Sequence, residues 1–132
     1  MEYCFYCFGH ENIRGTHRKT VEFTKDTELS PGGTCIIGIN ADFDFHNLKR
    51  LSGRIKTVLE VGNLVDSFTA IINSEFNDER EIVFRKSAYS SARTLAQYLD
   101  KAANGMNRDI IKSMRHRESR MKVTITELLS TD

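Results

Sequence analysis

The sequence predicts a mainly β protein: a two-layer β-sandwich or a barrel of about eight strands, with two short helices at its margins. Eight short segments are rich in β-branched and aromatic residues and are separated by turn-forming residues. Apolar residues follow a helical spacing in only two places. Strands and helices therefore do not alternate as they do in a doubly wound parallel sheet.

Residues 34–42 are expected to form a strand that is buried on both faces. Its large apolar residues follow one another without the spacing of a helix: Cys35, Ile36, Ile37 and Ile39. Both faces of such a strand need cover. A Pro-Gly-Gly turn precedes the segment, and Asp42 ends it before a short helix.

The other elements are assigned by alternation, helical spacing and turn residues. Further strands are expected at residues 3–8, 20–24, 54–61, 64–72, 81–85, 94–99 and 121–128. A helix at about 45–51 is expected to begin after Asp42 or Asp44, and a second one spans about 106–115. Gly62-Asn63 predicts a hairpin turn. The last residues, 130–132, are expected to fray.

The second half of the chain repeats the pattern of the first. Residues 21–25 (VEFTK) resemble residues 82–86 (IVFRK). Each is followed by a strand-like segment that ends in an aspartate, Asp42 or Asp100, and then by a helix and another strand. This order predicts an internal duplication, with pseudo-repeats at about 3–61 and 64–128, inside one domain of residues 1–132.

The composition is that of an ordinary globular protein, and its charges balance too closely to create a strong electrostatic field. The chain has 132 residues, with 19 basic and 18 acidic side chains and a formal net charge of +1. Such a balance gives no global attraction for nucleic acid or an anionic membrane. No apolar run is long enough to span a bilayer. We therefore expect a cytoplasmic protein without a membrane partner.

Two of the three cysteines, Cys4 and Cys7, form a C-x-x-C pair inside the first predicted strand. Residues three apart in a strand point to opposite faces, and no second pair completes a zinc site. The pair is thus predicted to be two separate thiols packed in the protein, rather than a metal or redox motif.

Short motifs recur in a fixed order along the chain: GHEN (9–12), TH (16–17), CIIG followed by AD (35–42), KS (86–87), RTL (93–95) and DKAA (100–103). In these motifs the chain resembles a small, single-domain archaeal family of unknown function. The resemblance implies a β-sandwich of jelly-roll type and an intracellular archaeal protein. It implies no established activity.

Basic and hydroxyl side chains around residues 85–101 favour a binding module for a small anionic or phosphorylated ligand. Arginine and lysine combined with hydroxyls form cradles for phosphate or carboxylate. The predicted ligand residues are Lys86, Ser87, Arg93, Asp100 and Lys101, with His10, Asn12 and His17 near the same mouth. The alternative is that these charges pair with Glu79, Glu81 and Asp100 in solvent. Tyr89 or Tyr98 could stack on bases, which leaves RNA as a less favoured partner.

His10 and His17 suggest a second class of function. They bracket one loop, and with Asp42 or Glu11 they would form a set of two histidines and one carboxylate, which suits zinc, iron or manganese. Such a divalent metal site would support metal-assisted hydrolysis or lyase chemistry. The alternative is that both histidines cap the loop by bonding its backbone. A third class is an interaction protein that forms a homodimer through a sheet edge.

Overall fold

The structure is a computed structural model that describes residues 1–129. Its strands are β1 (Glu2–Phe8), β2 (Thr20–Thr24), β3 (Ile36–Gly38), β4 (Arg54–Val61), β5 (Leu64–Ile72), β6 (Glu81–Arg85), β7 (Thr94–Gln97) and β8 (Arg120–Glu127). Its helices are α1 (Phe45–Lys49), α2 (Arg108–Ser113) and a 3-10 turn, η1 (Ala103–Gly105). The fraying expected at residues 130–132 lies outside the described residues.

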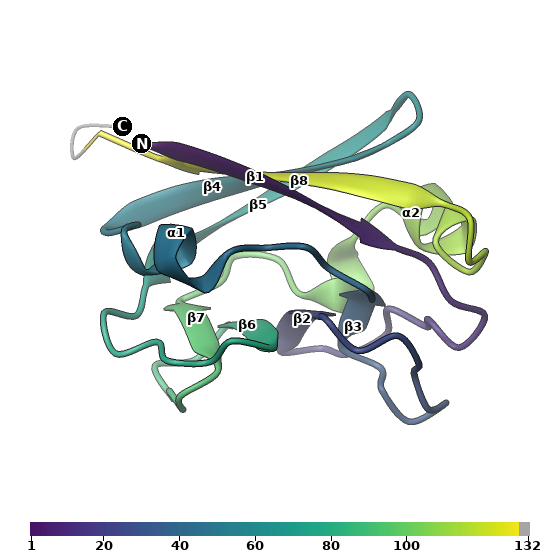
Figure 1. Cartoon of the computed structure of the whole chain (residues 1–132), viewed down its shortest axis with the longest axis horizontal. Coiled ribbons are helices and arrows are strands. Elements are labelled where there is room, and N and C mark those ends of the chain that lie inside the picture. The colour runs from purple at the N-terminus through teal and green to yellow at the C-terminus, as the bar shows by residue number, and fades with distance from the viewer. Residues whose placement is uncertain (130–132) are drawn as a thin grey trace.

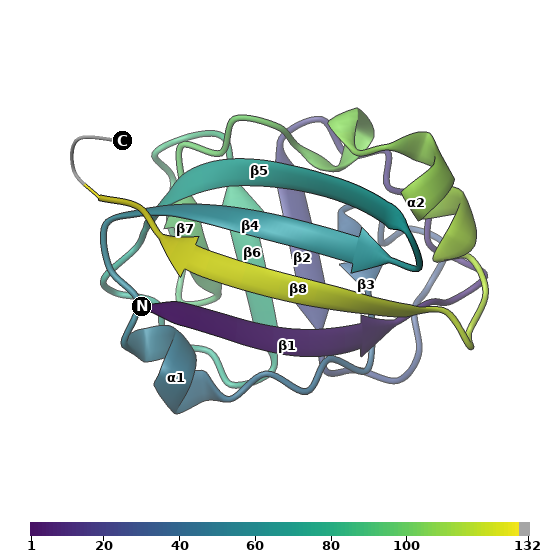
Figure 2. The same cartoon turned by 90° about the horizontal axis from the view of Figure 1, so that it is seen from above.

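All eight strands belong to one mixed sheet, in the order β1-β8-β4-β5-β7-β6-β2-β3. The sheet turns back on itself, so that β1, β8, β4 and β5 lie above β7, β6, β2 and β3 (Figure 1). We call these four-stranded parts the upper layer and the lower layer. Their strands cross when seen from above (Figure 2). The layers join where Ile71 and Ile72 of β5 pair with β7, and a single bridge between Phe8 and Ile39 links the opposite edges.

The mainly β prediction, with eight strands and two short helices, is confirmed. The arrangement differs from two separate antiparallel sheets, because the strands form one sheet that does not close. It also differs from a jelly roll, since β2–β3 and β6–β7 are parallel pairs. Apolar alternation reports which face a residue occupies, but it says nothing about the direction of the neighbouring strand.

The segment at 34–42 is buried as predicted but forms less strand than predicted. Ile37 and Ile39 are 0% and 3% exposed. Only Ile36–Gly38 pairs as a strand, and β3 lies at the end of the strand order rather than in its middle. The chain turns at Asn40, whose φ of 50° is in the left-handed region and ends the extended run.

Four phenylalanines connect the layers through the core. Phe5 of β1 packs edge-to-face on Phe23 of β2, with ring centroids 5.6 Å apart. Phe23 packs on Phe84 of β6 at 6.2 Å, and Phe84 packs on Phe68 of β5 at 4.9 Å. All four side chains are at most 2% exposed. We call this chain of rings the phenylalanine row; edge-to-face pairs stabilise a core beyond the area they bury.

The two halves of the chain use the same local devices. β2–β3 and β6–β7 both pair in parallel, and both have a register shift, at Glu22/Phe23 and at Val83/Phe84. Tyr98, with a φ of 57°, matches Asn40. The Asp42 carboxylate accepts the N–H of Tyr6 at 2.7 Å, and the Asp100 carboxylate accepts the N–H of Thr69 at 2.8 Å.

The helices begin where polar side chains cap them. Asp44, one of the two predicted caps, accepts the N–H of His46 at 2.9 Å and starts α1. Asn107 caps α2, which therefore begins two residues later than predicted. The preceding residues, Ala103–Gly105, form η1. Within residues 1–129, no helix is long and apolar enough to cross a membrane.

Removing either aspartate that binds a neighbouring strand should destabilise the fold. Asp42→Ala and Asp100→Ala each remove a carboxylate acceptor from a backbone N–H. We expect each variant to lose about 1 kcal/mol in the free energy of unfolding, measured by chemical denaturation. Glu79→Ala, at an exposed carboxylate without such a bond, is the control and should stay within about 0.5 kcal/mol of the wild type. A loss at only one aspartate would contradict their equivalence.

Candidate functional site

His10 is engaged on both ring nitrogens inside the protein. It is 1% exposed, and its Nδ1 accepts the N–H of Asn12 at 3.0 Å. This bond assigns the proton of the neutral ring to Nε2, which lies 3.1 Å from Glu28 Oε1. The guanidinium of Arg117 also approaches Nε2, at 3.0 Å. The ring therefore donates to Glu28 and leaves no free nitrogen for a ligand.

Arg117 holds the loops around His10 together. Its guanidinium donates to Glu11 at 2.9 and 3.0 Å and to Glu28 at 2.9 and 3.0 Å. We call His10, Glu11, Glu28 and Arg117 the Arg117 clamp. Hydrogen bonds from Arg117 lower the pKa of the Glu11 carboxyl to about 2, and with help from His10 they lower the pKa of Glu28 to about 2.

The structure does not bring the predicted metal ligands together. His17 Nδ1 lies 2.9 Å from Thr20 Oγ1 and accepts the N–H of Lys19 at 3.2 Å, while Asp42 binds the backbone of β1. Each histidine thus accepts a hydrogen bond from a backbone N–H of its own loop. This agrees with the alternative to a metal site, in which both histidines cap the loop by bonding its backbone. In the described part of the chain, no three His, Cys, Asp or Glu side chains form a group that could hold a metal ion.

Two of the predicted anion-binding cations are already paired. Arg93 Nη1 lies 2.7 Å from Glu81 and 3.6 Å from Glu22. The ammonium group of Lys101 is bonded to the carboxylate of Asp66. Glu81 was among the expected partners, whereas Asp66 and Glu22 were not. Each of these two cations therefore already has a carboxylate partner.

The other predicted ligand residues lie in separate surroundings. Asn12 donates to the carbonyl of Leu29 at 2.8 Å, and Ser87 accepts the N–H of Tyr89 at 3.2 Å. Lys86 is exposed, and Asp100 binds β5. Three hollows in the surface are lined by none of the eight predicted ligand residues. The predicted set therefore does not form one cleft.

A buried carboxyl that the sequence did not single out lies in the lower layer. Glu22 on β2 is 3% exposed, and the thiol of Cys35 donates to it at 3.4 Å. Burial, followed by a hydrogen bond with Glu81, raises the pKa of Glu22 to about 8, against a lowering by Arg93. The carboxyl is therefore mostly neutral at pH 7. In the sequence, Glu22 occupies the alternate position between Val21 and Phe23 that normally faces solvent.

Cys4 and Cys7 lie on opposite faces of β1, as predicted. Cys4 is half-buried and Cys7 fully buried, and all three cysteines are free. Burial raises the pKa of the Cys35 thiol to about 11 and also raises the pKa of Cys7. Protonated thiols in these positions are weak nucleophiles.

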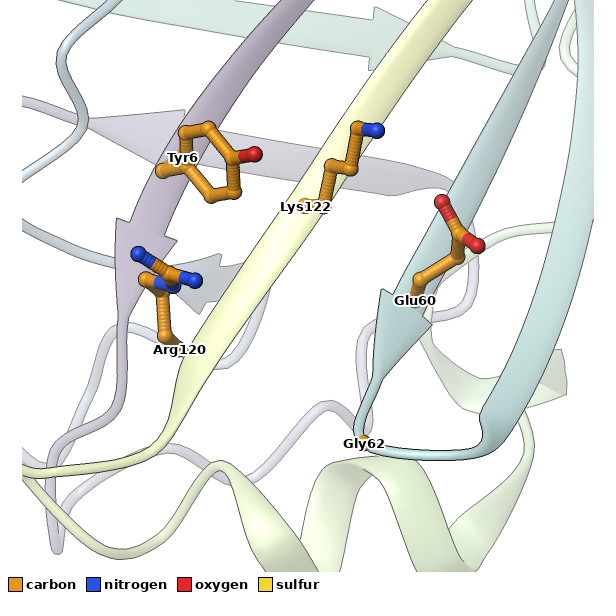
Figure 3. Close-up of a pocket in the computed structure, with 5 residues that line it drawn as sticks. All are labelled: Tyr6, Glu60, Gly62, Arg120 and Lys122. Atoms are coloured by element: carbon orange, nitrogen blue, oxygen red, sulfur yellow. The ribbon is translucent and has the colours of Figure 1, made fainter.

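The outer face of the upper layer carries a hollow of about 320 Å³. Tyr6 of β1, Arg120 and Lys122 of β8, Glu60 of β4 and the turn residue Gly62 line it (Figure 3). We call this hollow the β8 groove. Strand pairing builds it, because Tyr6 lies opposite Lys122 and Lys122 lies opposite Glu60. Arg120 and Lys122 share the face since they are two residues apart in one strand.

The cations of the β8 groove are free to meet an anion. The guanidinium of Arg120 lies 4.6 Å from the centre of the Tyr6 ring, which holds it by a cation–π interaction. Across residues 1–129, neither Arg120 nor Lys122 has a carboxylate partner, in contrast to Arg93, Lys101 and Arg117. The groove thus offers a guanidinium, an ammonium and a phenol as donors.

Sequence reasoning could not find this groove because its residues come from three distant parts of the chain, β1, the β4–β5 hairpin and β8. The alternation of residues 120–122 places Arg120 and Lys122 on one face of a strand. Only the pairing of β1 with β8 adds Tyr6 to them. A tyrosine at an alternate position of the first strand was the one available signal.

Residues 5–128 match a family described as "Domain of unknown function (DUF371)". The chain belongs to this family. A relative, the "Uncharacterized protein MJ0206" of Methanocaldococcus jannaschii, is 34% identical over 124 residues, which cover 87% of this chain and 92% of the relative. The resemblance to an archaeal family of unknown function is thereby confirmed.

In this DUF371 domain, the Arg117 clamp should make stability depend on acid pH. A carboxyl whose pKa is lowered in the folded state stabilises the fold above its ordinary value of about 4.5, and this contribution is lost as the pH falls towards 2. Arg117→Gln should therefore lose less stability than the wild type between about pH 5 and pH 3, measured by denaturant unfolding. Arg115→Gln, a neighbouring exposed arginine, should follow the wild type; equal acid dependence in all three proteins would contradict the clamp.

Glu22 should make the stability of the fold decrease as the pH rises, which is the opposite of the effect of the Arg117 clamp. Because its pKa is raised, its neutral form stabilises the fold fully below about pH 4.5, and this contribution is lost as the pH rises through about 8. Glu22→Gln keeps the shape of the neutral acid and cannot ionise. We expect its melting temperature, relative to the wild type, to rise between about pH 6 and pH 9. A Glu79→Gln control should show no such divergence, and parallel wild-type and Glu22→Gln profiles would show that Glu22 ionises normally.

Proposed function

We propose that this protein binds a small anionic or phosphorylated ligand in the β8 groove. The observation that supports this function is the pair of cations, Arg120 and Lys122, beside Tyr6 without a carboxylate partner in the described chain. Arg93 and Lys101, in contrast, each have a carboxylate partner. The function agrees with the sequence-based expectation, but the residues that carry it are different.

The donor set suits a phosphate or carboxylate. Stacking on Tyr6 orients the planar fork of Arg120, so less side-chain freedom is lost when an anion binds. Lys122 adds a point charge from the same face. Glu60, at the other wall, would accept a hydrogen bond from a ligand hydroxyl. These contacts favour a ligand that carries both an anionic group and hydroxyls.

We also infer that the two halves, at about 3–61 and 64–128, arose by duplication. The matched parallel pairs, left-handed residues and strand-binding aspartates support this origin. In this correspondence Tyr6 matches Thr69, and the Arg120/Lys122 pair matches Arg54/Lys56 at the start of β4. Equal losses of stability in Asp42→Ala and Asp100→Ala would support the equivalence of the halves.

Titration of ¹⁵N-labelled protein with inorganic phosphate tests the binding function. We expect amide shifts centred on Tyr6, Arg120 and Lys122, because these residues line the groove. The double variant Arg120→Gln/Lys122→Gln should weaken phosphate binding about tenfold or more, since it removes two charged donors.

The matched control is Lys112→Gln/Arg115→Gln, which removes the same charge from another hollow. It should bind phosphate as the wild type does. Shifts that centre on residues 86–93, or equal weakening in both double variants, would contradict a site in the β8 groove.

A further inference from the structure

The outer face of the upper layer is left uncovered by the fold. Seen from above, no described helix or loop crosses β1, β8, β4 and β5, and both helices lie at the margins (Figure 2). Side chains at alternate positions of these strands point away from the core, as the alternating burial of β4 and β8 shows. The β8 groove therefore lies on a broad open surface rather than in an enclosed pocket.

Two basic pairs lie on this face. Arg120 and Lys122 stand at the start of β8, and Arg54 and Lys56 stand at the start of the antiparallel β4. The register places Lys122 opposite Glu60 and Lys56 opposite Thr126, which is a separation of four residues along the ladder. At about 3.3 Å per residue, the two pairs lie roughly 13 Å apart. This spacing exceeds a single phosphate and suits an extended polyanion.

Hydroxyl groups lie between and beside the basic pairs. Thr124 of β8 and Ser67 of β5 flank Val58 in the row between Lys122 and Lys56. Thr126 and Thr69 flank Lys56 in the next row, where Thr126 donates to Glu2 at 3.2 Å. Hydroxyls can donate to or accept from a ribose 2′-hydroxyl. The face therefore combines separated cations with groups that recognise sugar rather than phosphate.

Tyr6 and Arg120 supply a stacking platform at one end of the face. The Tyr6 ring and the Arg120 guanidinium are in contact at 4.6 Å, and Phe8 lies opposite Arg120 in the β1–β8 ladder. Unpaired bases stack on tyrosine rings and on guanidinium planes in many RNA-binding sheets. A base could extend this stack while its phosphate meets Lys122.

We propose that the ligand is a single strand of RNA that lies across the outer face of the upper layer. This inference rests on the proposed anion-binding function, and it names the class of that ligand. Arg120 and Lys122 bind one phosphate, Arg54 and Lys56 bind a second one further along the strand, and Tyr6 stacks on a base. The hydroxyls between and beside the two pairs contact ribose.

The shape of the face favours a single strand over other occupants. A four-stranded surface is about 15 Å wide, and duplex grooves admit one helix or a two-stranded ribbon. A second copy of the chain would bury the two basic pairs of each copy, which outnumber the Glu60 carboxylate of the β8 groove, at a desolvation cost. A flexible single strand can follow the twisted sheet with its bases unpaired.

Fluorescence anisotropy with a labelled polyuridine RNA of about ten nucleotides, at about 50 mM KCl, tests the proposal. Tyr6→Ala should weaken binding about fivefold or more, and Tyr6→Phe should bind within about twofold of the wild type because the ring remains. Arg120→Gln/Lys122→Gln should lower the slope of log K against log salt by about 0.7, the value for the one phosphate that the pair binds. Lys112→Gln/Arg115→Gln is the charge-matched control and should keep the wild-type slope.

The outcomes separate this inference from the function on which it rests. Phosphate shifts in the groove without RNA binding would overturn the RNA proposal and leave anion binding intact, whereas the loss of both would overturn both. Tighter binding of duplex RNA, or equal binding of single-stranded DNA of the matching sequence, would contradict ribose contacts on this face. Self-association in the ultracentrifuge that Tyr6→Ala abolishes would assign the face to a second copy instead. Circular dichroism verifies that each variant folds.

Discussion

The phenylalanine row is the contact on which the rest of the molecule depends. Phe5 and Phe68 belong to the upper layer, Phe23 and Phe84 to the lower one, and their rings meet edge-to-face between the layers. Because the row joins strands of both halves, the sheet folds over one shared core instead of two. The inner faces of both layers are therefore buried against each other in this core.

Because the inner faces are buried, a ligand can bind only to the outer faces of the layers. All five residues of β2 in the lower layer are buried, and Glu22 is enclosed with Cys35 and Arg93 on the side away from the core. The upper layer instead alternates buried and exposed residues along β4 and β8. Its outer face is the broad open surface of the fold, and two cations without a carboxylate partner in the described chain, Arg120 and Lys122, lie on it.

Local patterns in the sequence predicted the positions of the strands and helices well. They did not predict which strands pair with each other or in which direction. Alternation placed β4 and β8 within about a residue of their observed bounds, and Asp44 was one of two predicted caps. The parallel pairs were not predicted, because alternation carries no strand direction. The pairing of Arg93 with Glu22 and Glu81, and of Tyr6 with Arg120, depends on strands that meet only in the folded chain. Binding residues inferred from sequence proximity alone were therefore dispersed.

Photo-crosslinking with a polyuridine RNA that contains 4-thiouridine tests most directly whether the open face of the upper layer is the binding surface. Mass spectrometry of the crosslinked peptides locates the contact independently of affinity. The account predicts crosslinks in β1 and β8, at peptides that contain Tyr6 and Lys122. Crosslinks confined to the loop around Tyr89, or to the lower layer, would contradict it.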